Sequence, residues 1–411
     1  MKKFLIYLLL PVLLAVSCPS SPVAQQDFDL SYTPQTPDTE NNYPPETMSE
    51  KTAFAYFRDE KILVGWNVGN TLDSHISGRA NETGWGNPRI NQEIFDGVKK
   101  AGFDIVRIPV TWMGYIGPAP DHHIDEKYLA RVAEVAQMAR KAGLKAIINL
   151  HHDGAHDGGW LSVKKAVASK AGYNEVTHKF TRVWKQIATY FKNYGDWLIF
   201  ESMNEIHDGN WGWGSDTVQS PQYDILNDWN RFFTEIVRGT GANNATRYVV
   251  LPAYCTVPKH TLASYFWLPP DSAPNRQIVT FHYYDPYEFG IASTRWEWGS
   301  EADKNRVVNE FAPFKPKYID KNIPVIIGEC GAVKQIIADK DKEEKARQNR
   351  LDYLSWVFGK AKEYGLVPIY WDNGATSGNG EKFGLFNRTN GQPISPESEA
   401  CIKAMINAVK K

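Results

Sequence analysis

Cysteine is scarce in this sequence, and neither sign of charge dominates. The 411 residues include four cysteines, and the formal net charge is −1. A nearly neutral chain gives no electrostatic reason to expect binding to nucleic acid or to an anionic membrane surface. Cys255, Cys330 and Cys401 show neither short-spaced pairing nor a metal-ligand pattern. We therefore expect three buried free thiols.

Long apolar runs are also absent, except at the N-terminus. Lys2 and Lys3 precede the run from Phe4 to Val16, which is short for a membrane-spanning helix. The run ends in LAVSC, which resembles the lipobox of bacterial lipoproteins. That resemblance implies a signal peptide over 1–17, a lipid on Cys18 as the sole membrane anchor, and an outer-membrane or cell-surface location. Ordinary secretion with cleavage near Ala24 is the alternative.

Residues 18–50 are rich in Pro, Ser, Thr, Asn, Asp and Gln and poor in aliphatic side chains. Such a composition buries too little apolar surface to order itself, so it predicts a disordered tether. No further linker, repeat or charge run follows. We therefore expect one domain over 51–411.

Within that domain, apolar runs alternate with amphipathic stretches. The predicted strands are Ile62–Val68, Asp104–Val110, Lys145–Leu150, Trp197–Met203, Tyr248–Pro252, Ile278–Tyr283, Pro324–Gly328 and Val367–Trp371. The predicted helices are Asn91–Ala101, Glu126–Ala142, Asn174–Tyr194, Tyr223–Arg238, Lys304–Lys321, Asp341–Tyr364 and Ser395–Val409.

Eight nearly continuous apolar strands alternating with helices predict a parallel sheet, and eight is the number that closes a (β/α)8 TIM barrel. A doubly wound open sheet is the alternative. It is disfavoured because no Gly-rich turn follows the first strand.

Polar residues gather where the predicted strands end, the face on which TIM barrels carry their active sites. Glu205 follows the fourth strand and Glu329 follows the seventh. Two carboxyls, each delivered by its own strand, suit acid/base and nucleophilic chemistry on a glycosidic bond. Glu201, deeper in the fourth strand, is better interpreted as a paired structural acid.

Eight motifs, in order, resemble those of the family five glycoside hydrolases, in the branch of bacterial endoglucanases, lichenases and xyloglucanases. They are GWNVGNTLD (65–73), WGNP (85–88), RIPVTW (107–112), NLHHDG (149–154), MNE (203–205), HYY (282–284), GE (328–329) and YWDNG (370–374). The resemblance covers residues 61 to 374. It implies a retaining mechanism in which Glu205 is the general acid/base and Glu329 the nucleophile.

The same resemblance implies roles for the surrounding residues. Arg107 and Tyr284 would hold Glu329 as an anion, and His282 would contact the acid/base. The expected substrate-binding residues are Asn67, Arg107, His151, His152, Asn204, His282, Tyr284, Trp371 and Asn373. Seven loop tryptophans are candidates for lining a cleft, although loop packing accounts for part of them: Trp85, Trp112, Trp160, Trp211, Trp213, Trp296 and Trp298. Trp184, Trp229 and Trp356 fall on predicted helices and are expected in the core.

The segment from His151 to Asp157 contains zinc-type ligands, but its spacing matches no zinc motif. We therefore expect no metal and no cofactor. The predicted activity is that of a monomeric, retaining endo-β-1,4-glucanase acting on a β-glucan polysaccharide or oligosaccharide. A xyloglucanase, mixed-linkage glucanase, β-mannanase or xylanase is the alternative within the family. A non-catalytic glycan-binding surface lipoprotein is the alternative outside it.

Overall fold

A closed barrel of eight parallel strands forms the centre of the protein. The computed structural model describes residues 28–209, 221–378 and 380–410. Around the barrel the strand order is β1-β10-β9-β8-β7-β6-β5-β4. Their bounds are β1 Gly65–Val68, β4 Ile105–Ile108, β5 Lys145–Asn149, β6 Leu198–Glu201, β7 Val249–Pro252, β8 Gln277–Tyr283, β9 Val325–Cys330 and β10 Leu366–Asp372. The predicted TIM barrel is confirmed, and all eight predicted strands overlap observed ones.

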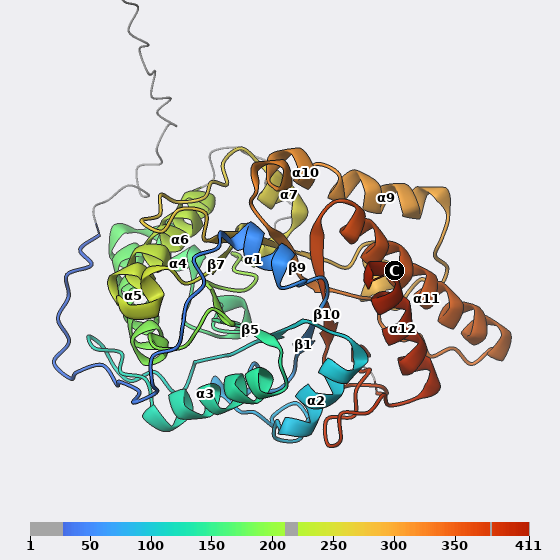
Figure 1. Ribbon diagram of the computed structural model, residues 1–411, viewed down its shortest axis with the longest axis horizontal. Helices are drawn as coiled ribbons and strands as arrows, with labels where there is room; N and C mark the ends of the chain where they lie inside the picture. Colours follow the sequence, from blue (N-terminus) through green and yellow to red (C-terminus); the bar gives the residue numbers. More distant parts are fainter. Residues whose placement is uncertain (1–27, 210–220, 379, 411) are drawn as a thin grey trace, which may run out of the picture.

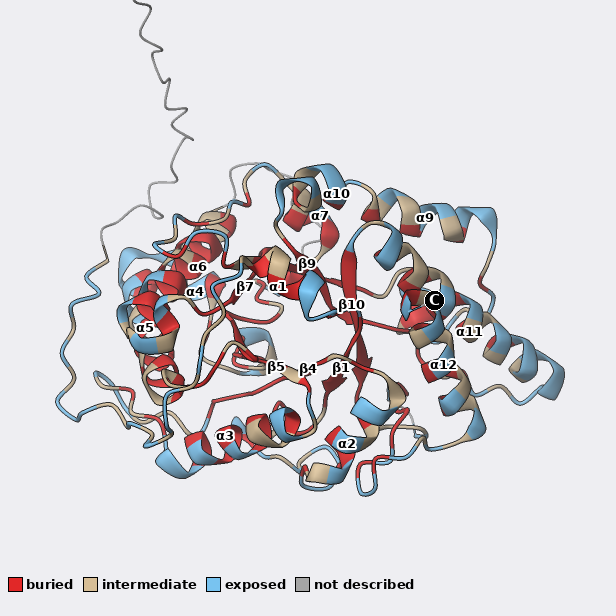
Figure 2. Cartoon of the chain, in the orientation of Figure 1, coloured by how far each residue is buried: buried red, intermediate tan, exposed pale blue. Residues whose placement is uncertain are grey.

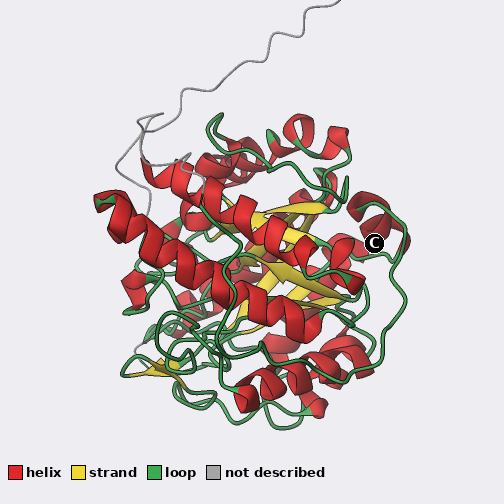
Figure 3. Ribbon diagram, turned by 90° about the vertical axis from the view of Figure 1, so that its left-hand side faces the viewer, coloured by secondary structure: helices red, strands yellow, loops and turns green. Residues whose placement is uncertain are grey.

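Helices surround the strands, which lie at the centre of the molecule (Figure 1, Figure 3). Their inner faces are buried and their outer faces exposed (Figure 2). The longer helices are α2 Gln92–Ala101, α3 Glu126–Lys141, α5 Lys170–Phe191, α6 Pro221–Gly239, α9 Glu301–Phe311, α11 Lys340–Glu363 and α12 Pro396–Lys410. The shorter ones are α1 Ala53–Asp59, α4 Val163–Ala168, α7 Pro258–Leu262, α8 Tyr287–Gly290 and α10 Phe314–Lys317. A small antiparallel hairpin, β2 His75–Ile76 with β3 Arg79–Ala80, lies in the loop after β1.

One predicted helix is broken. The stretch Lys304–Lys321 contains the end of α9, then α10, then a 3-10 turn over Ile319–Lys321. Pro313 lies between α9 and α10. Proline has no backbone N–H to continue a helical hydrogen-bond ladder, and its ring crowds the preceding turn. The helical periodicity continues past this residue, but the helix does not.

The helix α1 closes the end of the barrel at which the strands begin, and it lies across the barrel in Figure 1. Ala53, Tyr56 and Phe57 of this helix are buried in one cluster with the isoleucines and valines that point into the barrel. The Tyr56 ring stacks on Tyr248 with centroids 4.6 Å apart. Because α1 packs in one cluster with Ile105, the first residue of β4, and with Tyr248, just before β7, it covers the N-terminal ends of the strands, opposite the face that carries the predicted site.

The segment 28–50 packs against the barrel domain. Glu46 Oε2 accepts hydrogen bonds from Trp197 Nε1 at 2.6 Å and from the Gly195 amide at 2.7 Å. Asp38 pairs with the buried guanidinium of Arg182 at 2.6 Å. The prediction of a disordered tether over 18–50 is therefore wrong for its described part, 28–50. The segment lacks a core of its own, but its acids and aromatic rings pair with groups that the domain presents.

The three cysteines of the domain are free and buried, as expected. No helix among the described residues is both long and apolar enough to cross a bilayer. The predicted signal peptide, the lipid-bearing Cys18, Trp211 and Trp213 lie outside the described residues.

Candidate active site

One strand and one loop, from separate parts of the barrel, deliver the predicted carboxyls. Glu329 lies within β9, and Glu205 lies in the loop four residues after Glu201, the last residue of β6. The pairing of β8 with β9 shifts after Phe281, so that His282 pairs with Glu329 and Gly328 is an extra residue. Such β-bulges redirect side chains and are common beside active sites. Here the bulge sets Glu329 beside His282.

The two carboxyls are close together, and an imidazole lies beside both. One oxygen of Glu205, one oxygen of Glu329 and a nitrogen of His282 all lie within 4.8 Å of one another. His282 Nδ1 is 2.6 Å from Glu205 Oε1 and 3.6 Å from Glu329 Oε2. Retaining glycosidases hold their two carboxyls about 5–5.5 Å apart, whereas inverting enzymes leave about 6.5–9.5 Å for a water. The spacing is that of the retaining class.

Glu329 accepts hydrogen bonds from a cation and from a hydroxyl. Arg107 Nη1 donates to its Oε1 at 2.7 Å, and the Tyr284 hydroxyl donates to its Oε2 at 2.8 Å. A buried cation and a hydroxyl donor both stabilise the charged carboxylate. The predicted contacts of Arg107 and Tyr284 with Glu329 are confirmed. The site therefore contains one carboxylate suited to nucleophilic attack.

Glu205 has the opposite environment. Burial raises its pKa to about 7, although the nearby Arg107 charge opposes that shift. Burial also lowers the pKa of His282 to about 4, so this imidazole is neutral and does not neutralise Glu205. A carboxyl with such a pKa carries a proton near neutral pH and can donate it. Glu205 therefore has the environment that a proton donor requires.

Arg107 is a buried hub that does not itself reach the cleft. Besides Glu329, it donates to Glu201 Oε2 and Asn204 Oδ1, each at 2.7 Å, and to Asn67 Oδ1 at 3.2 Å. Arg107 and Asn67 have no exposed surface. Their prediction as substrate-binding residues is wrong, because both lie beneath the pocket and support its carboxyls. The prediction of Glu201 as a paired structural acid is confirmed.

Asn204 remains at the surface of the pocket, with 5% of its area exposed. Its Oδ1 accepts from Arg107, which leaves its amide NH2 group to donate to a ligand. Trp371, in β10, lies parallel to the His151 ring with centroids 5.8 Å apart. A Cβ on Gly69 would lie 2.7 Å from the Trp371 ring, so this indole needs glycine beside it. Asn204, His151 and Trp371 therefore face one region above Glu329.

Asn373 is hydrogen-bonded mainly within the loop after β10. Its Oδ1 accepts from the backbone amides of Ala375 and Phe383, and its Nδ2 donates to the Glu381 carbonyl at 3.0 Å. Every polar atom of the side chain is engaged by its own loop. Its role as a substrate-binding residue stays a prediction, and its amide also shapes the loop after β10.

His152 forms part of an aromatic rim. Burial disfavours its charged form, but the hydrogen bond and charge of Asp157 raise its pKa overall. The Trp85 ring lies 5.2 Å from His152, is 40% exposed, and donates from Nε1 to the His75 carbonyl. Sequence reasoning missed His75 and considered Asp157 only as a possible metal ligand. The hairpin that places His75 and the loop that folds Asp157 back carry no periodic signal.

The other tryptophans divide between core and loops. Trp112, Trp184 and Trp229 are fully buried, and Trp298 is 7% exposed. Of the loop tryptophans, Trp112 is therefore core rather than cleft. Asn149, which sequence reasoning also missed, donates to Glu201 Oε2 at 2.8 Å from the end of β5. Its place in the motif NLHHDG was the available signal.

Two groups among the described residues have metal-type ligand atoms close together. One is Asp73, His151 and His152, and the other is the catalytic set of Glu205, His282 and Glu329. In the second group the His282–Glu205 hydrogen bond already occupies the facing atoms. The absence of a metal requirement stays a prediction.

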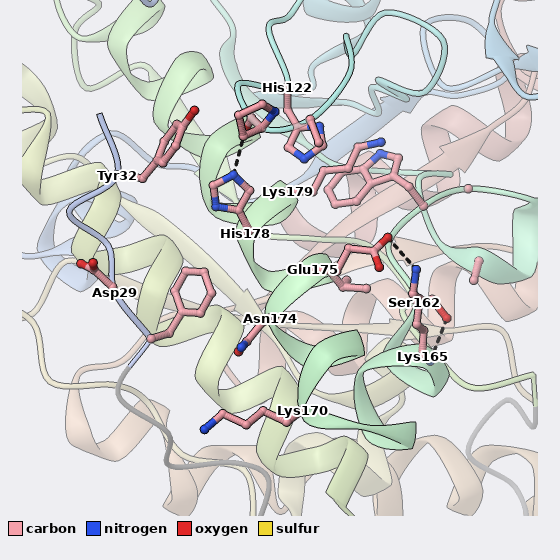
Figure 4. Close-up of a pocket in the computed structure, with 17 residues that line it drawn as sticks. Asp29, Tyr32, His122, Ser162, Lys165, Lys170, Asn174, Glu175, His178 and Lys179 are labelled. Atoms are coloured by element: carbon pink, nitrogen blue, oxygen red, sulfur yellow. Dashed lines mark hydrogen bonds and ion pairs between the residues drawn. The ribbon is translucent and has the colours of Figure 1, made fainter. Parts of the chain in front are cut away.

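A separate cavity of about 1400 Å³ lies on the flank of the barrel and contains neither catalytic carboxyl. Figure 4 shows Lys179 and His178 of α5 on one side of it and Tyr32 and Asp29 of the N-terminal segment on another. Its Lys165 is already paired with Glu175 at 2.6 Å. Because it lacks Glu205 and Glu329, this cavity is not the catalytic pocket.

Comparisons with known proteins agree with this geometry. Residues 70–377 match the family model described as Cellulase (glycosyl hydrolase family 5). The chain is 36% identical to endoglucanase A of Paenibacillus barcinonensis, over 80% of this chain and 84% of that protein. It is 34% identical to a xyloglucan-specific endo-beta-1,4-glucanase of Bacteroides ovatus, over 84% and 69%. A solved broad specificity GH5-4 endoglucanase from Bacteroides salanitronis superposes with a TM-score of 0.81 at 40% identity, covering 91% of this chain and 99% of that one.

The family match spans every strand that carries a catalytic residue, and the carboxyl pair has the spacing and unequal environments of a retaining glycosidase. This chain belongs to glycosyl hydrolase family 5, the cellulase family.

Proposed function

We propose that this protein is a retaining endo-β-1,4-glucanase that cuts internal bonds of cellulose-like β-glucans. One observation carries the proposal. Two carboxyl oxygens lie within 4.8 Å of each other, one belonging to a carboxylate bound by Arg107 and Tyr284 and the other to a carboxyl whose pKa is about 7. Such a pair supplies a nucleophile and an acid in one pocket.

In the first step, a Glu329 oxygen attacks the anomeric carbon. The glycosidic C–O bond breaks as Glu205 transfers its proton to the departing oxygen, which leaves as a sugar hydroxyl. The product is a glycosyl ester on Glu329. Asn204, held by Arg107, presents its amide NH2 to the sugar hydroxyl next to the reacting carbon.

In the second step, Glu205 is ionised and removes a proton from an incoming water. The water oxygen bonds to the anomeric carbon, the ester bond breaks, and Glu329 regains its charge. Two inversions restore the starting configuration, and Glu205 is protonated again. Arg107 and Tyr284 stabilise the Glu329 carboxylate before and after each cycle.

The relatives differ in the glucan that their names specify, so substrate range is tested directly. Hydrolysis is measured on carboxymethyl cellulose, barley β-glucan, xyloglucan, glucomannan and xylan, following reducing ends and viscosity together. We expect activity on the glucans, with viscosity falling well before reducing ends accumulate, because internal bonds are cut. Preference for glucomannan or xylan alone would identify a mannanase or xylanase instead.

The control variants separate catalysis from binding. Glu329→Gln should abolish hydrolysis while retaining glucan binding. Glu310→Gln, which neutralises a half-buried carboxyl on α9 with a similarly raised pKa, should behave as wild type. Glucan binding by the wild type without any release of reducing ends would establish a non-catalytic glycan-binding protein.

We further propose that the protein is secreted, acylated at Cys18 and held at the bacterial outer membrane or cell surface as a monomer. The charged Lys2-Lys3 start, the apolar run and the LAVSC sequence support this location. Cys18→Ser should move the protein from the membrane fraction to the soluble fraction, whereas Cys401→Ser in α12 should not. A lipid-free wild-type chain beginning near Gln25 would contradict acylation, and light scattering decides the oligomeric state.

A further inference from the structure

The barrel interior becomes polar directly below the catalytic pocket. Ile199, Ile278 and Ile326 belong to the apolar cluster at the lower end of the barrel. Side chains two residues apart on a strand share a face, so the next inward positions are occupied by Glu201, Thr280 and Gly328. This second layer lies between the apolar floor and the two catalytic carboxyls.

Three buried side-chain atoms in and just above this layer have no hydrogen-bond partner among the described residues. They are Glu201 Oε1, Thr280 Oγ1 and His282 Nε2. Glu201 and Thr280 are fully buried, and His282 is 5% exposed. Buried polar atoms are nearly always hydrogen-bonded, to ordered water where protein is lacking. The three atoms therefore need a hydrogen-bond partner that the described residues do not supply.

Gly328 brings two of these atoms together. A Cβ at this position would lie 2.7 Å from Thr280 Oγ1 and 3.0 Å from His282 Nε2. Both atoms therefore lie close to Gly328, at the bulge in β9. Glu201 is fixed in place by Arg107 and Asn149 through its other oxygen, and its charge favours the protonated form of His282.

The hydrogen of His282 can be assigned from its surroundings. Nδ1 faces two carboxyl oxygens, at 2.6 Å and 3.6 Å, so it carries the ring hydrogen. The neutral ring then has an acceptor lone pair on Nε2. Glu201 Oε1 is a second acceptor, because its carboxylate is bound to Arg107. The Thr280 hydroxyl has a single hydrogen and cannot satisfy both. One water, which donates twice and accepts once, satisfies all three atoms.

We propose that Glu201, Thr280 and His282 hold one buried water beneath the catalytic pocket, and that Thr280 acts through it as a positioning residue. The water donates to Glu201 Oε1 and His282 Nε2 and accepts from Thr280. His282 therefore keeps its hydrogen on Nδ1 and donates to Glu205 Oε1. The acid proton of Glu205 is then carried by Oε2, the oxygen left to face the departing sugar.

Two measurements on the wild-type protein test the site without reference to activity. In a high-resolution crystal structure, we expect a water within hydrogen-bonding distance of all three atoms. In nitrogen-15 spectra of histidine-labelled protein, with His282→Asn used for assignment, we expect Nδ1 to be pyrrole-like and Nε2 pyridine-like at neutral pH. Absence of the water, or a hydrogen on Nε2, would overturn the proposal.

The kinetic test rests on the proposed glucanase activity. Thr280→Val keeps the shape but removes the hydroxyl, and we expect kcat on barley β-glucan to fall on the order of tenfold with KM nearly unchanged. Thr280→Ser should restore it. Thr234→Val, which removes a buried hydroxyl from α6, should leave kcat unchanged. An unchanged kcat in folded Thr280→Val would contradict the positioning role.

A substrate with an acidic phenol gives the second readout. Its first step needs little protonation, so the phenol burst should survive in Thr280→Val while the hydrolysis of glucan slows. The pH dependence of kcat should shift as well, because His282 is surrounded by charged and titratable groups. These groups are Glu205, Glu329, Arg107, Glu201 and His151. Equal losses on both substrates would indicate general damage and contradict the proposal. An inactive wild type would refute the glucanase but leave the crystallographic and nitrogen-15 results to decide the water site.

Discussion

Arg107 binds Glu329 from beneath the pocket, with Nη1 donating to Oε1 at 2.7 Å and no part of the guanidinium exposed. Replacing arginine by lysine keeps the charge but loses the planar fork that also holds Glu201 and Asn204. We expect Arg107→Lys to lower kcat/KM about 100-fold, because the nucleophile is displaced. A value within threefold of wild type would show that charge alone suffices.

The same ion pair predicts a loss of stability when the charge is removed. Arg107→Gln leaves two buried carboxylates without their cation, and breaking a buried pair costs about 3–5 kcal/mol. Urea unfolding measures this cost. The exposed surface pair of Lys165 and Glu175 supplies the control: Lys165→Gln should change the free energy of unfolding by less than about 1 kcal/mol.

The two catalytic carboxyls should fail differently in the presence of azide. Glu205→Ala should slow glucan hydrolysis by about 10²–10⁴-fold but spare the first step on an aryl glycoside with an acidic phenol. Azide needs no general base, so it should restore turnover and give a β-glycosyl azide. In Glu329→Ala, azide attacks the substrate directly and should give the α product. Exchange of these two outcomes would reverse the assigned roles.

The pH dependence follows from Glu205. Burial raises its pKa to about 7, so the proton needed for the first step is present below that pH and lost above it. We expect kcat/KM on glucan to fall as the pH rises through about 7. For an aryl glycoside with an acidic phenol, the same limb should be weaker, because little protonation is required. A basic limb above pH 9 on glucan would contradict this assignment.

Residues 28–50 should contribute to stability. Glu46→Ala removes the acceptor of the Trp197 indole and the Gly195 amide, so we expect a loss of about 1–3 kcal/mol in the free energy of unfolding. Glu40→Ala removes only an exposed partner of Lys192 and should cost less than about 1 kcal/mol. Equal, negligible effects would support the disordered tether.

Chelation tests the expectation that no metal takes part. The catalytic pair donates and accepts protons through its own carboxyls, and the mechanism contains no step that a cation must perform. We expect full activity after dialysis against EDTA. A loss restored by one particular divalent ion would direct attention to Asp73, His151 and His152.

The strand order, and the meeting of Glu205 and Glu329 on one face of the barrel, could be predicted because both depend on period and position. The roles of the two carboxyls came only from the family resemblance. Buried parallel strands are apolar throughout, and their ends meet on one face of a barrel. Depth along a strand could not be predicted in the same way. Asn67 and Arg107 lie within strands and are fully buried beneath the pocket, so neither side chain reaches the surface that a ligand would touch. These outcomes depend on barrel stagger and loop packing, which leave no periodic trace in a sequence.

Long-range pairing explains the remaining differences. The acids of the segment 28–50 bind groups well over a hundred residues away, such as Arg182 and Trp197. Composition describes a segment in isolation, so it predicts disorder wherever the partners are distant. The bulge at Gly328 is similar, because only the pairing of β9 with its neighbours reveals it.

Closure of the barrel by α1 means that, among the described residues, the two carboxyls can be reached from the opposite end of the barrel but not through its floor. Water for the second step cannot rise through the floor and must enter from the side that the departing chain has just left. Any sugar hydroxyl still bound there occupies the same approach to the glycosyl ester. Hydrolysis and glycosyl transfer therefore compete for one entrance, and high concentrations of short β-glucans should shift the products toward longer chains.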